Sequence, residues 1–184
     1  MKKIYYGKAV YDQKEIKAVN NVLIHNSLSL VDGKKVKLLE KKVSKLFGKK
    51  FGLMVNSGSS ANLLALAALN FKKNSEIITP NLTFSTTVAP IYQLGLKPHF
   101  IGVEKNKFLA DTSHIEKCIN KKTVGLMIPN LLGNIAKWEK INLIAKKYKL
   151  KIIEDSADTI GYSIKKKNTG KLSDIVTNSF YASH

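Results

Sequence analysis

The fold is decided by residues 123–155, TVGLMIPNLLGNIAKWEKINLIAKKYKLKIIED. The stretch begins with a continuous apolar run, which is typical of a strand that is buried on both faces. AKWEKINLIAKKYK follows with apolar residues at helical spacing, and LKIIED is a second apolar strand. A strand, a helix and a strand in this order predict two parallel strands joined by a helical crossover.

The same alternation extends over most of the chain. We expect further strands at 51–56, 76–80, 97–103 and 175–181, and further helices at 12–25, 35–47, 59–71, 83–95 and 114–120, the last one behind Ser113. Short apolar strands with helical connections predict an α/β fold with three layers, in which helices cover both faces of a mainly parallel sheet. No repeat or linker interrupts the 184 residues, so we expect a single domain.

The composition excludes several classes of protein. A net charge of +18 suggests a nucleic-acid-binding protein, but all 31 basic residues are lysine, whereas base readout and paired phosphate contacts favour arginine. We therefore expect a solvated lysine surface and no nucleic-acid site, and attraction of an anionic substrate stays open. Cys118 is the single cysteine, which fits a reducing, cytoplasmic location. The N-terminal residues carry charge but no apolar segment, and no apolar run reaches about 20 residues, so we expect neither a signal peptide nor a membrane segment.

Polar clusters follow the expected strands, and ligands of such folds bind at the carboxyl ends of strands. The first cluster is NSGSSAN, residues 56–62. Unpaired N–H groups at the following helix start, with Gly58 and the hydroxyls of Ser57, Ser59 and Ser60, would suit a phosphate group. An ordinary serine N-cap is the alternative, although capping accounts for one serine and not for three. Neither the P-loop nor the dinucleotide-binding glycine pattern is present.

Two further clusters are PNLTFS, residues 80–85, and IIEDSAD, residues 152–158. Phe84 could stack on a planar ligand, but a place in the core is the simpler interpretation. Glu154, Asp155 and Asp158 follow a buried strand, and a buried carboxylate needs a partner. That partner could be a metal ion or a protonated heterocyclic nitrogen, and helix capping by Asp155 is the alternative.

The chain ends on NSFYASH, residues 178–184. Ser179 could donate to a phosphate, and His184 could serve as a base, because imidazole has an unperturbed pKa of about 6.5. A lone histidine more often has a structural role. The spacing of these residues is therefore weak evidence for a catalytic role of His184.

Taken in order, these motifs resemble the large domain of fold-type-I pyridoxal-phosphate enzymes, and more narrowly the DegT/StrS family of nucleotide-sugar aminotransferases. The resemblance begins at YGKAVYDQKEIKAV and continues through VNSGSSANLLAL, PNLTFSTTVAPIYQLGLKPHF, NLLGN and IIEDSADTIGY to SFYASH. It implies that the cofactor is pyridoxal 5'-phosphate or pyridoxamine 5'-phosphate, with no metal. It also implies that the loop residues Gly58, Ser59 and Ser60, next to Ser57, hold the cofactor phosphate.

The resemblance implies roles for the remaining residues as well. Phe84 would stack on the pyridine ring, Asp155 would pair with its protonated nitrogen, Asp158 would lie near the ring hydroxyl, and Ser179 would add a phosphate contact. The family's aminotransferases carry S-F-x-x-x-K, whose lysine binds the cofactor covalently. Position 184 holds histidine instead, which is the pattern of the 3-dehydratases of nucleotide-linked 4-keto-6-deoxy sugars.

Imidazole cannot form a Schiff base, so a histidine enzyme would use the amine form of the cofactor and expel the C3 hydroxyl of the sugar. The alternatives are a sugar aminotransferase, with a lysine just beyond the recorded end, and a catalytically inactive fragment. Family members are about twice this length, so residues 1–184 would be one incomplete large domain that lacks its last strands and the small C-terminal domain. The resemblance further implies a nucleotide-sugar substrate for deoxysugar and surface-polysaccharide biosynthesis. It also implies a homodimer for the full chain, and for some relatives an iron–sulfur reductase partner.

Overall fold

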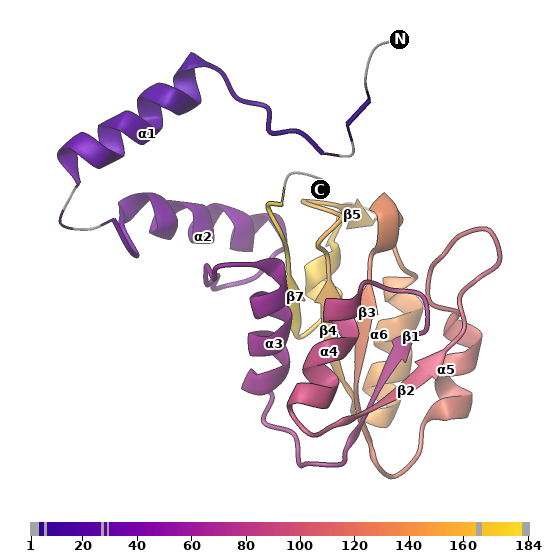
Figure 1. Ribbon diagram of the computed structural model, residues 1–184. Helices are drawn as coiled ribbons and strands as arrows, with labels where there is room; N and C mark the ends of the chain where they lie inside the picture. Colours follow the sequence, from indigo (N-terminus) through magenta and orange to yellow (C-terminus); the bar gives the residue numbers. More distant parts are fainter. Residues whose placement is uncertain (1–3, 6, 27, 29, 165–166, 182–184) are drawn as a thin grey trace.

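The computed structural model describes residues 4–5, 7–26, 28, 30–164 and 167–181. At its centre is a five-stranded sheet with the strand order β2-β1-β3-β4-β7 (Figure 1). The strands are β1 (Glu76–Pro80), β2 (Lys97–Ile101), β3 (Thr123–Pro129), β4 (Lys151–Asp155) and β7 (Ile175–Thr177). All four neighbouring pairs are parallel. The sequence prediction of a parallel α/β sheet is therefore confirmed.

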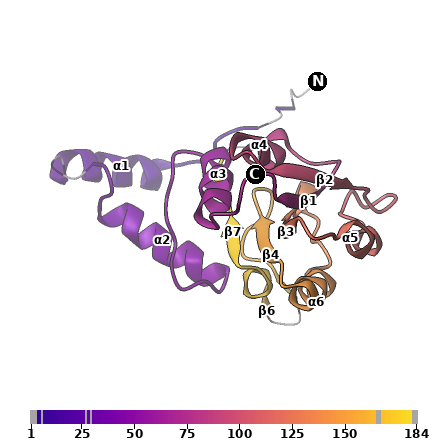
Figure 2. The same cartoon turned by 90° about the horizontal axis from the view of Figure 1, so that it is seen from below.

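Helices cover both faces of this sheet, as Figure 2 shows. One face packs on α3 (Gly58–Ala68) and α4 (Ser85–Gln93), and its core includes Leu66, Ile91 and Met127. The other face packs on α5 (Thr112–Cys118) and α6 (Trp138–Tyr148), and its larger core includes Ile115, Trp138 and Ile128. Most of β1, β3 and β4 is buried, which explains why these strands read as continuous apolar runs.

The first two helices lie outside these layers. α1 (Gln13–His25) begins with a capping box, in which Asp12 accepts a hydrogen bond from the N–H of Lys14 and Glu15 reaches back to the N–H of Asp12. None of its residues is buried, and Figure 1 shows it standing away from the sheet. α2 (Lys34–Leu46) leads back toward β7 and ends before Gly48, whose φ is +67°. Both helices were predicted to within a residue or two.

Three sequence predictions were wrong in detail. Residues 51–56 form no strand, and Phe51 and Leu53 are 78% and 71% exposed. An apolar run becomes a strand only when another strand pairs with it, and none does among the described residues. The last strand ends at Thr177 instead of residue 181. α5 begins two residues earlier than expected, at Thr112, because Asp111 and not Ser113 is its N-cap.

The remaining elements connect these layers. β5 (Ser163–Ile164) and β6 (Lys167–Asn168) form a short antiparallel hairpin, and the 3₁₀ turns η2 (Leu131–Gly133) and η3 (Thr169–Leu172) follow β3 and β6. Within the described ranges, no helix combines the length and the apolar character that crossing a membrane requires. Because the five sheet strands are parallel, their carboxyl ends meet at one edge, where Pro80, Pro129 and Asp155 lie.

Candidate functional site

Asp155, the last residue of β4, is the centre of a buried hydrogen-bond network. Its Oδ2 accepts hydrogen bonds from Nδ2 of Asn62 at 2.9 Å and from Oγ1 of Thr87 at 2.8 Å. Its Oδ1 accepts one from the N–H of Ala157 at 3.2 Å. The residue is 5% exposed, so these donors compensate for the loss of water around its carboxylate. A turn follows instead of a helix, so helix capping by Asp155 is excluded.

Glu154 points to a different network. Its side chain is fully buried and accepts hydrogen bonds from Nδ2 of Asn130 at 3.1 Å, from Oγ of Ser156 at 3.0 Å and from Oγ of Ser173 at 3.1 Å. Burial raises the pKa of Glu154 above its usual value, and the hydrogen bonds, which favour the charged form, offset only part of this effect. Glu154 therefore ties β4 to the segments on either side of it.

Asp158 lies in the turn after β4 and fixes a neighbouring turn. Its Oδ2 accepts a hydrogen bond from the N–H of Leu132 at 2.7 Å. Leu132 has a φ of +55°, a backbone conformation that is costly for a branched side chain and needs such support. Asp158 thus holds the NLLGN segment at the carboxyl edge of the sheet.

The three carboxylates of IIEDSAD do not form a metal site. Glu154, Asp155 and Asp158 each have separate hydrogen-bond partners. In the part of the chain that the structure describes, no group of three or more histidine, cysteine, aspartate or glutamate side chains could hold a metal ion. Of the partners proposed for a strand-end carboxylate, a protonated heterocyclic nitrogen remains. It fits because the described donors leave one of the roughly four lone-pair positions of Asp155, on Oδ1, available for an N–H group.

The start of α3 is built as the sequence suggested. Ser57 is the N-cap, and its Oγ accepts a hydrogen bond from the N–H of Ser60 at 3.1 Å. Gly58 is the first helical residue and Ser59, which follows it, is exposed. The N–H groups of the first helical turn lack intrahelical acceptors and lie at the positive end of the helix dipole. Both properties suit the binding of an anion. Capping by Ser57 is confirmed, and it leaves the N–H groups of Gly58 and Ser59 for a ligand.

Ser179 lies against this helix start. A Cβ atom added to Gly58 would be 3.0 Å from the Cβ of Ser179 and 3.3 Å from its Oγ. Asn178 anchors the segment, because its Nδ2 donates to the carbonyls of Ser156 at 2.6 Å and Thr159 at 3.0 Å. The structure therefore brings two predicted phosphate donors together across 121 residues of sequence, from Gly58 to Ser179.

Phe84 is not part of the core. It is 67% exposed and forms the N-cap position of α4, three residues before Thr87. Its carbonyl accepts from the N–H of Thr87 at 3.0 Å, and the hydroxyl of Thr87 binds Asp155. An exposed aromatic ring at the carboxyl edge of the sheet is available for stacking, whereas the core interpretation is excluded.

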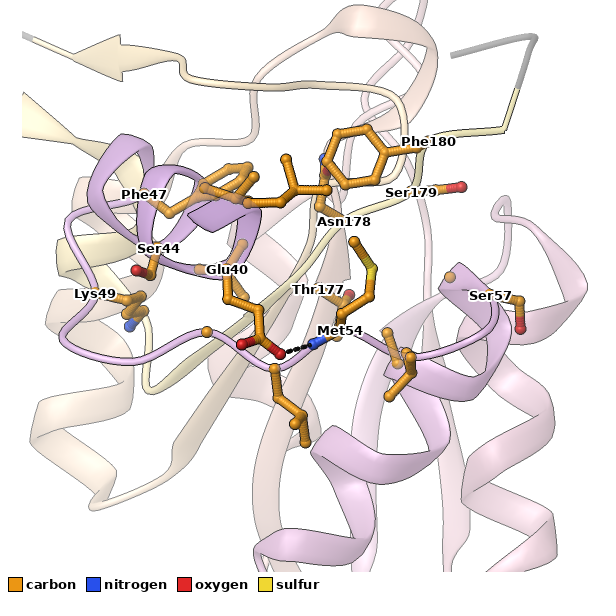
Figure 3. Close-up of a pocket in the computed structure, with 18 of the residues that line it drawn as sticks. Glu40, Ser44, Phe47, Lys49, Met54, Ser57, Thr177, Asn178, Ser179 and Phe180 are labelled. Atoms are coloured by element: carbon orange, nitrogen blue, oxygen red, sulfur yellow. Dashed lines mark hydrogen bonds between the residues drawn. The ribbon is translucent and has the colours of Figure 1, made fainter. Parts of the chain in front are cut away.

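An apolar groove of about 560 Å³ extends from the start of α3 to α2 (Figure 3). Its walls are α2, residues 47–58, β7 and residues 178–181, with Ser57, Gly58 and Ser179 at one end. In Figure 3 the carboxylate of Glu40 reaches across to the N–H of Met54, at 2.8 Å. Asp155 and Phe84 do not line this groove. The groove therefore adjoins the candidate site only at the residues predicted to bind phosphate.

Residues 178–181 also line a second cavity, of about 450 Å³. Asp158 and Ser179 line it, together with Lys8, Val10 and Tyr181. Two of the predicted site residues thus share this cavity. His184, the predicted base, lies outside the described residues.

Sequence reasoning missed the side chains that hold Asp155. Asn62 and Thr87 are 3% and 0% exposed, and Thr177, whose Oγ1 donates to Oδ1 of Asn62 at 2.6 Å, is 5% exposed. One signal was present, because Asn62 is a lone amide in an otherwise apolar helix, GSSANLLALAA. A buried amide needs partners, so its position was informative.

Comparisons with known proteins identify the family. The model of the DegT/DnrJ/EryC1/StrS aminotransferase family matches residues 10–184. A GDP-4-keto-6-deoxy-D-mannose 3-dehydratase from Yersinia pseudotuberculosis is 33% identical over 184 residues, which are 97% of this chain and 46% of that protein. The chain thus spans about half the length of the curated relatives it matches.

Two solved structures share the fold. The Escherichia coli GDP-4-keto-6-deoxy-D-mannose-3-dehydratase with bound hydrated PLP is 33% identical, with a TM-score of 0.81 over 88% of this chain and 43% of that one. An aminotransferase involved in the biosynthesis of pseudoaminic acid in Helicobacter pylori is 30% identical, with a TM-score of 0.91 over 98% of this chain and 48% of that one.

Proposed function

Because this chain belongs to the DegT/DnrJ/EryC1/StrS aminotransferase family, we propose that it carries the cofactor site of a 3-dehydratase acting on a nucleotide-linked 4-keto-6-deoxyhexose. The single observation that carries the proposal is the arrangement at the carboxyl edge of the sheet. There, Gly58 and Ser179 adjoin at a helix start, and Asp155 is held in place one helical turn away by Asn62. An anion site beside a buried carboxylate suits a phosphorylated cofactor with a protonated ring nitrogen.

Pyridoxamine 5'-phosphate is the cofactor that this donor set would hold. The N–H groups of Gly58 and Ser59, with the hydroxyls of Ser57, Ser60 and Ser179, would bind its phosphate. Oδ1 of Asp155 would accept the ring N–H, Phe84 would stack on the ring, and Asp158 would lie near the ring hydroxyl. When bound, the cofactor supplies an amine for the sugar ketone and an electron-withdrawing ring.

His184 is the proposed base. It stands where the family's aminotransferases have the lysine that binds the cofactor, and imidazole takes up and returns protons near neutral pH. The base would remove the proton that starts the elimination, and the C3 hydroxyl would leave as water. A sugar aminotransferase is the alternative within the family, and the Helicobacter pylori protein of that kind supports keeping it.

We propose that residues 1–184 are one incomplete large domain. The support is the groove between β7 and residues 51–56, two segments that face each other without forming a strand pair in the described structure. A further strand from the rest of a longer chain would fit between them and cover Phe51 and Leu53. This domain would act in the cytoplasm as part of a homodimer on a nucleotide-sugar substrate, with an iron–sulfur reductase as its partner, as for some relatives. These last expectations rest on the family resemblance.

Cofactor binding tests the proposal. The full chain is mixed with pyridoxamine 5'-phosphate in one sample and with pyridoxal 5'-phosphate in another, and binding is measured by calorimetry. Both samples are then reduced with borohydride and analysed by mass spectrometry. We expect tight binding of the amine form and no cofactor attached to a lysine of the candidate site. A cofactor-modified lysine at the candidate site in the reduced pyridoxal sample, located by peptide mapping, would replace the dehydratase proposal by the aminotransferase one.

A further inference from the structure

Asn62 connects four segments of the candidate site through one side chain. It lies on α3, one turn after Gly58. Its Nδ2 donates to Oδ2 of Asp155, on β4, at 2.9 Å and to the carbonyl of Thr86, at the start of α4, at 3.2 Å. Its Oδ1 accepts from Oγ1 of Thr177 at 2.6 Å, on β7. All the polar atoms of this amide side chain are therefore used.

The cost of burying Asn62 shows that these bonds matter. An amide that is buried without hydrogen-bond partners destabilises a protein, because it gives up its bonds to water and gains none in return. At 3% exposure Asn62 avoids this cost only while Asp155, Thr86 and Thr177 keep their present positions. The neighbouring residues Leu63, Leu64 and Leu66 are apolar, so helix packing alone would be served by another leucine.

The contacts of Asn62 link the two ends of the candidate cofactor site. Through α3 it is rigidly joined to Gly58, and through β7 it is joined to Ser179, two residues after Thr177. Through Oδ2 it fixes the orientation of Asp155, so that Oδ1 keeps a free acceptor position. Thr87 reinforces this orientation from α4.

We propose that Asn62 is a positioning residue that sets the separation between the phosphate-binding helix start and the Asp155 carboxylate. This inference rests on the proposed function. The site thereby selects ligands in which a phosphate group and a protonated heteroaromatic nitrogen are covalently linked at one particular separation. Asn62 itself touches neither group.

Three probes test the inference with the full chain: inorganic phosphate, unphosphorylated pyridoxamine and pyridoxamine 5'-phosphate. Phosphate tests binding at the start of α3 alone, and pyridoxamine tests binding at Asp155 alone. Pyridoxamine 5'-phosphate binds tightly only when the two sites are separated by the distance that its own structure requires. Dissociation constants are measured by calorimetry or ligand-observed NMR for the wild type and for Asn62→Ala. We expect the linked ligand to lose about tenfold or more in affinity, the worth of one hydrogen bond to a charged group, with smaller losses for the fragments.

Asn130→Ala is the matched control. Asn130 is also buried, at 1%, and binds Glu154, Ser156 and the indole N–H of Trp138, but it does not bind Ser57, Ser60 or Ser179. It should destabilise the fold while leaving the ratio of linked-ligand to fragment affinity unchanged. Thr177→Val, which removes one bond that orients Asn62, should lower the ratio by a smaller factor and serves if Asn62→Ala does not fold.

The outcomes separate the inference from the proposed function. If the wild type binds pyridoxamine 5'-phosphate and both Asn62→Ala and Thr177→Val keep the wild-type ratio, the positioning role is wrong and the proposed function stands. An equal loss for all three probes in Asn62→Ala would also overturn it, because it would indicate a general structural role. If the wild type binds none of the probes, the proposed function fails and the inference fails with it.

Discussion

Gly58 and Ser179 approach so closely that a Cβ atom on Gly58 would lie 3.0 Å from the Cβ of Ser179. This separation is shorter than nearly all contacts that real Cβ atoms make. The absence of a side chain at position 58 therefore allows the segment after β7 to reach the start of α3.

Gly58→Ala should weaken phosphate binding with little change in stability. The added methyl group pushes Ser179 away from the helix start, whereas alanine favours a helix over glycine by up to about 1 kcal/mol, which offsets the crowding. We expect a severalfold loss of affinity for pyridoxamine 5'-phosphate, measured by calorimetry, and a midpoint of denaturant unfolding close to that of the wild type.

Gly102→Ala is the control for this change, because a Cβ there would meet only His114, at 3.5 Å, an ordinary contact. It should leave cofactor affinity unchanged. Equal affinities of the Gly58→Ala variant and the wild type would show that Ser179 does not contribute to the phosphate site.

Asp155→Asn should weaken cofactor binding by about tenfold to a hundredfold, the worth of a hydrogen bond to a charged partner. The amide oxygen of asparagine can still accept from Asn62 and Thr87, so the fold should remain. The amide NH₂ then takes the Oδ1 position, where it can accept neither the ring N–H nor the N–H of Ala157, so a small loss of stability accompanies the loss of affinity. Asp111→Asn is the control, because Asp111 lines neither cavity and the amide oxygen of asparagine can keep the bond from the N–H of Ser113 at the start of α5. Similar losses in both variants would contradict the specific pairing of Asp155 with the ring.

Glu154→Gln should stabilise the protein more at neutral pH than at acidic pH. Burial raises the pKa of Glu154 in the folded state above the value of 4.5 for an unperturbed glutamate. The folded protein therefore holds this proton more tightly, and its contribution to stability is present below pH 4.5 and lost as the pH rises through the raised pKa. Glutamine cannot ionise and escapes this loss, while Ser173 can rotate its hydroxyl to accept from the new amide.

Glu104→Gln should show the opposite pH dependence. Hydrogen bonding to Lys137, at 2.6 Å, is the main cause that lowers the pKa of Glu104, with a smaller effect of Lys107 and an opposing effect of burial. Its stabilising effect is present above pH 4.5 and lost as the pH falls through the lowered pKa. Denaturant unfolding of both variants and the wild type between about pH 3 and about pH 7.5, a range that spans the usual pKa values of carboxylates, would measure both trends. Two curves with the same slope would contradict the assignment for Glu154.

The parallel sheet could be predicted from sequence because its strands and helices are marked by local periodicity. Asp155 could likewise be placed at a strand end from the run IIED. Residues 51–56 were misassigned because an apolar pattern says that a strand can form and not whether a partner is present. The bond from Asn62 to Asp155 spans 93 residues. No local pattern encodes such a contact, although the lone amide in α3 indicated that some buried partner existed.

The reaction proposed for this site is removal of the C3 hydroxyl of a nucleotide-linked 4-ketosugar, with His184 as base. The most direct measurement is a single turnover of the full chain with pyridoxamine 5'-phosphate and GDP-4-keto-6-deoxymannose, followed by NMR and mass spectrometry of the sugar. The account predicts loss of the C3 hydroxyl with wild-type protein. It also predicts that His184→Lys slows this loss by roughly 10²–10⁴, the usual contribution of a general base. A product that keeps the C3 hydroxyl and gains an amino group at C4 would contradict the account.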